Sequence, residues 1–223
     1  MTEILGVPRT FGRLVNHDPR NRAYGIVVSP TATPKTVSWD VPDLPVLDQA
    51  DLGACTCFAT SQAVNLQRAR AGRADLLTSD DAKQLYREAT RIDPFDGSWE
   101  PDDTGSDGTS ACKAAKAAGL IREYRHAFGL KQMLLALQSG PVIVGTEWLS
   151  DMTTPTADHL VRVSGSLEGG HEYCVIGCDI ERGVVTILNS WSDQWADRGR
   201  AHITFADMDR LLQAQGDVTV PVT

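Results

Sequence analysis

The first half of the chain carries hydrophobic residues at helical spacing. After Cys55, the apolar residues Phe58, Ala63 and Leu66 return to one face, and Gly72 offers a natural stop. A polar Thr-Ser-Asp-Asp stretch with the composition of a capping box precedes the second such pattern. Helices are therefore predicted over residues 55–70, 78–92, 109–118 and 131–139.

After Gly140 and Pro141 the pattern changes to apolar runs rich in β-branched residues. Such runs predict strands, and Glu181 to Gly183 would form a hairpin turn between two of them. Helices followed by strands indicate an α+β protein. We expect a mainly helical lobe over about 37–125, a mainly β lobe over about 126–223, and the active site in a cleft between them. The predicted strands cover residues 142–146, 171–180, 184–188 and 200–205.

Residues 1–36 follow a different pattern, because four prolines and several turn residues interrupt any periodicity. We interpret this segment as an irregular arm with one short strand at residues 24–28. The catalytic domain would then begin near Val37 and extend to residue 223.

Composition narrows the classes of partner. The 223-residue chain has a net charge of −8 and no run of lysine or arginine, so neither nucleic acid nor an anionic membrane is an expected partner. The start of the chain lacks the pattern of a signal peptide, and no apolar run reaches membrane-spanning length. We therefore expect a cytoplasmic protein.

The five cysteines are an odd and scattered set, which predicts reduced thiols rather than a disulfide framework. His171, Cys174 and Cys178 resemble metal ligands in composition. On a regular strand, however, His171 would face one way and the two cysteines the other. We therefore expect neither a metal site nor a cofactor.

Cys55 stands where a loop becomes a helix, in the predicted first turn. Free backbone N–H groups and the helix dipole favour a thiolate there, and a neighbouring imidazolium can lower a thiol pKa to roughly 3–4. Taken alone, such a residue is more often a buried structural cysteine. A catalytic role requires partners from elsewhere in the chain.

Two later residues supply such partners. His171 begins an apolar strand and Asn189 follows the next one, so a hairpin with a bulge or skew would bring them together. An imidazole can activate the thiol and protonate a leaving amine, while a carboxamide orients the ring. Gln49 can join the backbone N–H of Cys55 in binding an oxyanion. Taken alone, each residue also fits a purely structural role, His171 as a histidine at the end of a strand and Asn189 as a turn residue.

In this order the residues resemble the papain-like cysteine peptidases, and in particular short-armed bacterial and phage chains without a full propeptide. The resemblance implies that Cys55 is the nucleophile, His171 the acid/base, Asn189 the orienting residue and Gln49 the oxyanion donor. Trp191 would shield the hydrogen bond between His171 and Asn189. The motifs that carry the resemblance are Asp48-Gln49 with Gly53-Ala54-Cys55, Gly170-His171 with Val175-Ile176-Gly177, and Asn189-Ser190-Trp191 with Trp195 and Gly199.

The chain also departs from the family pattern. Thr56 stands where an aromatic residue is usual, and Leu52 where a bridging cysteine is usual. Ala50, Ser192 and Ala196 replace glycines, which are chosen where φ is positive or backbones approach closely. One wall of the cleft is therefore expected to be reshaped. Without a full propeptide, either the arm covers the cleft or substrate specificity restrains the enzyme.

The Gly-rich stretch 103–108 falls where related enzymes bind an extended substrate. Gly105 and Ser106 are candidates for backbone pairing with a peptide, and Gly170 and Trp191 are further candidate substrate contacts. The expected function is a cysteine endopeptidase that cleaves polypeptides through an acyl-enzyme. Two alternatives stay open: a cell-wall peptide amidase or transpeptidase on the same fold, and a catalytically silent papain-like module for binding or assembly.

Overall fold

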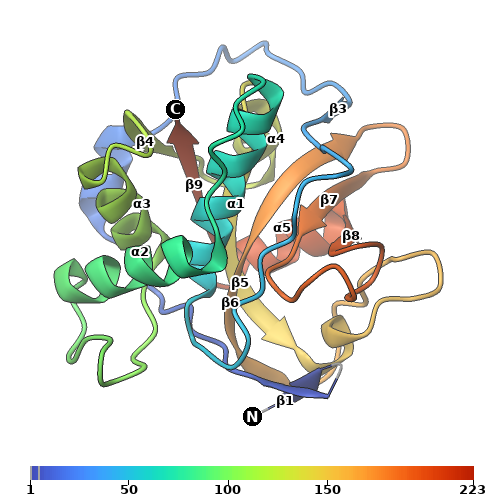
Figure 1. The fold of residues 1–223 in the computed structure, drawn as a ribbon. Helices are drawn as coiled ribbons and strands as arrows, with labels where there is room; N and C mark the ends of the chain where they lie inside the picture. The colour runs from blue at the N-terminus through green and yellow to red at the C-terminus, as the bar shows by residue number, and fades with distance from the viewer. Residues whose placement is uncertain (1, 5) are drawn as a thin grey trace.

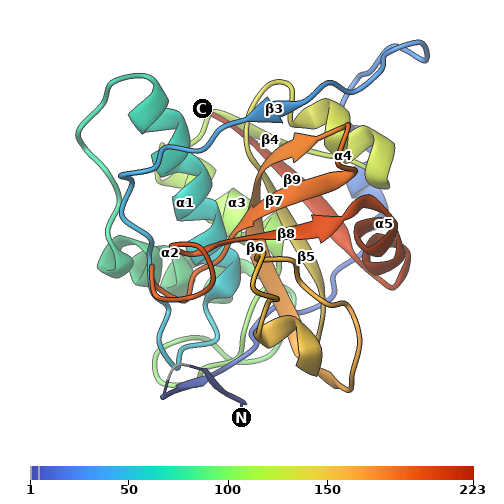
Figure 2. The ribbon, with the colours of Figure 1, turned by 90° about the vertical axis from the view of Figure 1, so that its right-hand side faces the viewer.

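The computed structural model describes residues 2–4 and 6–223, which form helices on both sides of one antiparallel sheet. Figures 1 and 2 show α1, α2 and α3 on one side of the strands and α5 on the other. The helices are α1 (Cys55–Arg70), α2 (Ser79–Ile92), α3 (Gly108–Ala117), α4 (Leu130–Ala136) and α5 (Phe205–Gln213), with short 3-10 helices η1 (Pro19–Tyr24) and η2 (Ser150–Thr153).

The main sheet has seven strands, in the order β4-β9-β5-β6-β7-β8, with β3 pairing to β6. A separate hairpin, β1–β2, opens the arm. The arm then passes η1 and reaches β3 at the opposite end of the molecule (Figure 1). The strands are β1 (Thr2–Ile4), β2 (Val7–Arg9), β3 (Val37–Ser38), β4 (Glu123–His126), β5 (Val142–Leu149), β6 (Leu167–Asp179), β7 (Val184–Leu188), β8 (Arg200–Thr204) and β9 (Asp217–Val222).

The α+β class is confirmed, and the local sequence signals explain several element boundaries. Helix α1 begins at Cys55, as predicted, and α2 begins after the predicted capping box, in which Thr78 and Asp81 exchange side-chain-to-backbone hydrogen bonds. Gly119 has φ +71° just after α3, the left-handed conformation that ends a helix. Gly183, with φ +66°, turns β6 into β7.

Other parts of the arm and the end of the chain were not predicted correctly. The short strand expected at residues 24–28 is wrong, because η1 extends to Tyr24 and Asp18 caps its start through the Arg20 N–H. Strands β1, β2, β3, β4 and β9 and helix α5 were not predicted either. Strand β9 pairs with both β4 and β5, so its stability depends on residues far away in sequence.

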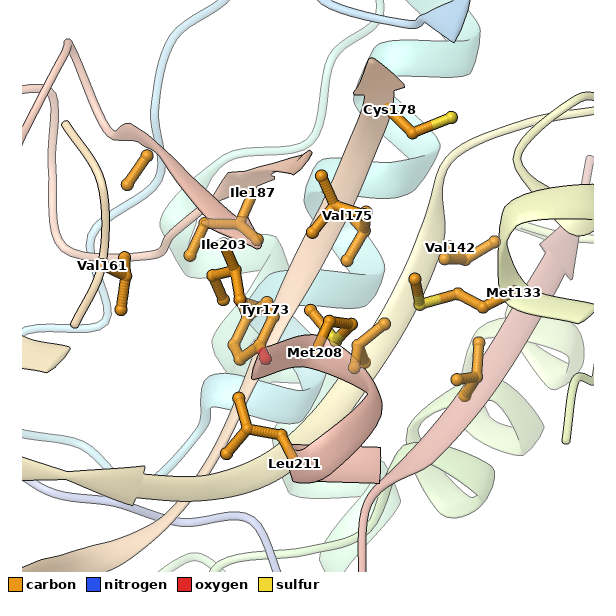
Figure 3. Packing of buried hydrophobic residues seen from close by; sticks show 14 of the residues in the cluster. Met133, Val142, Val161, Tyr173, Val175, Cys178, Ile187, Ile203, Met208 and Leu211 are labelled. Carbon is orange, nitrogen blue, oxygen red and sulfur yellow. The ribbon is translucent and has the colours of Figure 1, made fainter. Parts of the chain in front are cut away.

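Strand β6 separates two hydrophobic clusters. Tyr173 and Val175 point into the cluster beneath α4 and α5, which Figure 3 shows, whereas Cys174 and Ile176 point into the cluster beneath α1, α2 and α3. A bulge between Val175 and Gly177 shifts this alternation. Cys178 therefore joins the cluster of Tyr173, so the expectation that Cys174 and Cys178 share a face is wrong.

No helix within residues 2–4 and 6–223 is long and apolar enough to cross a membrane.

Candidate active site

Helix α1 places Cys55 in the interior of the protein. Cys55 is the first residue of α1 and is fully buried. The loop before it is fixed by Asp103, whose carboxylate accepts hydrogen bonds from the Gly53 N–H at 2.9 and 3.1 Å and from the Tyr86 hydroxyl at 2.7 Å. The thiol also lies against the backbone N–H of Glu172, the residue that follows His171. Helix α1 and strand β6 therefore meet at the thiol.

His171 and Asn189 form the predicted hydrogen bond, with 2.8 Å between Nε2 and Oδ1. Cys174 pairs with Leu188 across β6 and β7, and the bulge in β6 absorbs the offset that the sequence required. The other ring nitrogen of His171, Nδ1, is buried and has no hydrogen-bond partner among the described residues. It is therefore free to exchange a proton with another group.

Aromatic rings enclose the imidazole of His171. The Trp191 ring stacks on it, with 4.8 Å between centroids and an interplanar angle of 27°, and Trp148 meets it edge-on at 5.0 Å. Both tryptophans are fully buried. The hydrogen bond to Asn189 is therefore kept from water, as expected for Trp191.

Gln49 is oriented by the loop that follows Asn189. Its Oε1 accepts a hydrogen bond of 2.7 Å from the Ser190 hydroxyl, which directs the amide nitrogen away from that loop. Nε2 donates to the Leu52 carbonyl at 2.8 Å and to the Thr10 carbonyl of the arm at 3.2 Å. A carbonyl oxygen thus already lies at the amide that was predicted to bind an oxyanion.

Arm residues 9–14 run directly through this site. The N–H of Arg13 donates to the Gly170 carbonyl at 2.9 Å, and the N–H of Ser106 donates to the Gly12 carbonyl at 2.8 Å. The N–H of Leu14 donates to the Ser106 carbonyl at 2.8 Å. The arm therefore adds a strand-like segment between the Ser106 loop and β6, in the mode by which proteins bind extended peptides.

The side chains of the arm fit the site closely. Phe11 meets the His171 ring edge-on at 5.8 Å, and Arg9 forms a salt bridge with Asp48 beside Gln49. Gly12 packs directly against the backbone of Gly53, because a Cβ atom on Gly12 would lie 1.8 Å from the Gly53 carbonyl oxygen. Glycine is the one residue that fits here without displacing backbone.

The four candidate substrate contacts meet the arm in different ways. Ser106 pairs with it through both backbone groups, and Gly170 accepts one hydrogen bond. The N–H of Gly105 instead donates to the Tyr86 hydroxyl at 2.7 Å, while its missing side chain leaves room for the Gly12 carbonyl. Trp191 meets the Phe11 ring edge-on at 6.1 Å.

Burial dominates the electrostatics of the thiol and the imidazole, and two arm residues, Gly12 and Arg9, contribute to it. Burial raises the pKa of the Cys55 thiol to about 12, the Glu172 carboxyl adds to the rise, and nearby backbone N–H groups, including that of Gly12, oppose it. Burial lowers the pKa of His171 to about 4, and the charge of Arg9 adds to this, whereas the hydrogen bond that the ring donates to Asn189 opposes it. The lowered thiol pKa expected from the helix dipole is therefore wrong for this state, because desolvation outweighs the dipole.

Three residues that the sequence resemblance places at glycine positions have left-handed backbone. Ala50, Ser192 and Ala196 have φ values of +52°, +65° and +50°. Left-handed backbone costs a residue with a Cβ roughly 1–2 kcal/mol. The chain carries this strain beside the site rather than relaxing these loops to ordinary φ values.

Sequence reasoning missed two acidic residues that lie next to the site. Glu172 is fully buried directly after His171, and Asp217 at the start of β9 binds the arm through Arg13. The available sequence signal for Glu172 was a glutamate inside an apolar run. No such signal existed for Asp217, because β9 was not predicted. Within the described part of the chain, no group of three or more His, Cys, Asp or Glu side chains could hold a metal ion.

Comparison with known proteins gives matches at the level of structure. No family model and no curated protein sequence matches the chain. Xylellain, a cysteine protease from Xylella fastidiosa, is similar with a TM-score of 0.77 and 16% identity over 100% of this chain and 99% of that one. The chain has the papain-like fold.

Two further structures with this fold are precursor forms. Digestive procathepsin L 3 from the larval midgut of Tenebrio molitor has a TM-score of 0.67 and 16% identity, over 97% of this chain and 76% of that one. The proform of Amb a 11, a ragweed pollen cysteine protease, has a TM-score of 0.64 and 17% identity, over 87% of this chain and 66% of that one. In the papain-like fold of this chain, the site lies where α1 meets β6, with the arm across it.

Proposed function

We propose that the chain is a cysteine endopeptidase that hydrolyses polypeptides, and that its own arm holds it in a blocked state. The observation that carries the proposal is the arrangement around His171. Nε2 is fixed by Asn189, Nδ1 is unpartnered within the described residues, and the Cys55 thiol lies against the next peptide unit of the same strand.

The reaction uses four groups in named roles. The Cys55 thiol transfers its proton to Nδ1 of His171, and the thiolate attacks the carbonyl carbon of the scissile bond. The oxyanion that forms accepts hydrogen bonds from Nε2 of Gln49 and from the backbone N–H of Cys55. The imidazolium of His171 then protonates the leaving amine, which leaves a thioester on Cys55.

Deacylation reverses these roles. His171 takes a proton from water, hydroxide adds to the thioester carbon, and collapse of the intermediate releases the carboxylic acid product and returns the proton to the Cys55 sulfur. Asn189 keeps Nε2 engaged throughout, so Nδ1 stays directed at the reacting atoms. The aromatic rings around the imidazole protect this hydrogen bond from competing water.

The arm supports the proposal because it is bound as a peptide would be. Its backbone pairs on both edges, and its Thr10 carbonyl takes the hydrogen bond of Gln49 that an oxyanion would need. With the thiol pKa raised and the imidazole pKa lowered, the thiol and imidazole are both neutral near pH 7. Displacing the arm would open the site to substrate and to water, and the water would favour the ion pair of the Cys55 thiolate and the His171 imidazolium.

A glycine substitution in the full-length chain tests both parts of the proposal. Gly12→Ala places a Cβ against the Gly53 backbone and should displace the arm. Its matched control is Gly25→Ala, where φ is −61° and the nearest contact is a movable ring edge of Phe128 at 3.3 Å. Labelling of Cys55 by an epoxysuccinyl probe at pH 7 should accelerate at least about tenfold in Gly12→Ala and stay unchanged in Gly25→Ala.

Peptide cleavage separates the endopeptidase from the silent module. The Gly12→Ala chain should cleave an unstructured polypeptide, and adding Cys55→Ala should abolish cleavage, whereas adding Cys112→Ala should not. If Cys55 in the opened chain reacts no faster than Cys112 and no peptide is cut, the enzyme proposal fails. Mass spectrometry of the products in the presence of an added amine distinguishes hydrolysis from transfer to an acceptor.

A further inference from the structure

Three neighbouring strands place two carboxyl groups around a gap on one face of the sheet. Glu172 on β6 lies opposite Gly145 on β5, and Gly145 lies opposite Asp217 on β9. Residues directly opposite each other share a face, so the two carboxyl groups flank a position that has no side chain. Two strand spacings of roughly 4.8 Å separate their backbones by about 9–10 Å. We call this gap the Gly145 slot.

Arg13 of the arm fills the Gly145 slot. A Cβ atom on Gly145 would lie 2.7 Å from Nε of Arg13 and 3.0 Å from Oδ2 of Asp217, so the guanidinium lies over the glycine. Nε donates to Asp217 at 3.1 Å, and Nη2 donates to both Asp217 and the Gln215 carbonyl, the latter at 2.6 Å. The Arg13 side chain is only 1% exposed. The slot binds a guanidinium through its fork of donors.

The opposite wall of the slot carries unused hydrogen-bonding capacity. Both carboxyl oxygens of Glu172 are buried without a hydrogen-bond partner among the described residues, as is Nη1 of Arg13. Burial raises the pKa of Glu172, Asp217 and Asp107 add to the rise, and Arg13 opposes it. A carboxyl group buried this deeply is costly unless a cation faces it. Removing Arg13 would leave the slot acidic and empty.

The backbone of the arm carries this side chain into the slot. Arg13 is the residue whose N–H bonds to Gly170, one position before His171, so the slot lies beside the reacting groups. Any extended peptide that pairs with Gly170 and Ser106 in the same way would direct a side chain into it. The slot is therefore positioned to bind one side chain of the substrate.

We propose that the Gly145 slot selects a basic side chain, arginine in preference to lysine, in the polypeptide substrate, and that Arg13 occupies it as an internal mimic of that side chain. Asp217 supplies the charge, Glu172 adds two buried oxygens without a hydrogen-bond partner among the described residues, and the Gln215 carbonyl favours the forked guanidinium over an ammonium. This inference rests on the proposed peptidase function for its biological meaning, but binding tests it independently of cleavage.

The experiment compares three peptides that differ in one side chain. The full-length chain with Gly12→Ala and Arg13→Gln has its arm displaced and lacks the competing guanidinium. Fluorescent hexapeptides Arg-Thr-Phe-Gly-Xaa-Leu, which copy residues 9–14 with arginine, lysine or citrulline as Xaa, are titrated into it. The arginine peptide should bind at least about tenfold more tightly than the citrulline peptide, with lysine between them.

Isosteric variants assign the preference to the slot. Asp217→Asn should reduce the ratio of arginine to citrulline affinity to within about threefold, whereas Asp193→Asn, on an exposed loop, should leave it unchanged. Equal affinities for the arginine and citrulline peptides, or a ratio unaffected by Asp217→Asn, overturn the proposal.

A measurement with the arm in place guards against misfolding of the opened chain. In the otherwise unchanged chain, Arg13→Gln should accelerate Cys55 labelling more than Arg13→Lys does, and Arg22→Gln, on an exposed part of the arm, should not accelerate it. Equal rates for Arg13→Gln and the unsubstituted chain count against the slot. Selective binding of the arginine peptide without any cleavage would support the arginine-selecting slot and refute the peptidase function. Cleavage without a preference for arginine would support the peptidase function and refute the slot.

Discussion

Two consecutive residues of β6, His171 and Glu172, face opposite sides of the sheet and have opposite surroundings. His171 lies among aromatic rings and is hydrogen-bonded to Asn189. Glu172 lies beside a slot that holds a guanidinium. The first environment keeps an imidazole oriented and dry, and the second attracts positive charge. One strand thus separates the proposed chemistry from the proposed selection of substrate.

The arm contacts both surroundings with neighbouring residues. Phe11 packs against the ring of His171, and Arg13 enters the Gly145 slot. Gly12, between them, packs against the backbone of Gly53. The proposed blocked state therefore depends on both an apolar contact and an ionic contact. Changes on the His171 side should affect turnover, whereas changes on the Glu172 side should affect which peptides bind.

The largest expected effect comes from removing the imidazole. In the Gly12→Ala chain, His171→Ala should lower kcat/KM for peptide cleavage by about 10³-fold or more, because it removes the group proposed to accept the thiol proton and protonate the leaving amine. Asn189→Ala should lower it by about 10- to 100-fold, since it only orients the ring. Steady-state kinetics on one peptide measures both. Near-wild-type rates for both variants would refute the proposed roles.

The two sides of β6 should also respond to pH with opposite signs. The pKa of His171 is lowered to about 4 by burial, so between about pH 6.5 and 4 the unfolded chain binds more protons and stability falls as the pH falls. The contribution is roughly 3 kcal/mol at most. Burial raises the pKa of Glu172, so its contribution is present below about pH 4.5 and is lost as the pH rises.

Urea unfolding of single variants between pH 4 and 7 separates these contributions. Relative to the unsubstituted chain, His171→Gln should gain stability as the pH falls, and Glu172→Gln should gain stability as the pH rises. Thr31→Ser, at an exposed turn of the arm and without a titratable group, should parallel the unsubstituted chain. Parallel curves for all four chains would show that neither buried group is linked to folding in this way.

The smallest expected effect concerns backbone strain beside the site. Ala50 is exposed with φ +52°, so Ala50→Gly should stabilise the chain by about 1 kcal/mol. Ala71→Gly, at an exposed position with φ −85°, should not stabilise it. Thermal unfolding of the two variants tests this. Stabilisation by both, or by neither, would mean that strain at Ala50 is not what the substitution relieves.

The helices that place the thiol could be predicted because their signals are local. The helix start at Cys55, the capping box at Thr78 and the stop at Gly119 each depend on residues within a few positions. Strand β9 depends instead on pairing with β4 and β5, and the sequence offered little sign of it. The contact between His171 and Asn189 was predictable because one hairpin joins their strands.

The sequence by itself determined the helix-then-strand order, the thiol at a helix start, and the motifs around Gln49, His171 and Asn189. Only the tertiary structure decided that arm residues 9–14 cross the site, that burial keeps Cys55 a neutral thiol there, and that Glu172 and Asp217 flank Gly145. The physical reason is sequence separation. Capping and periodicity act over a few residues, whereas desolvation and the meeting of charges depend on which distant segments the fold brings together.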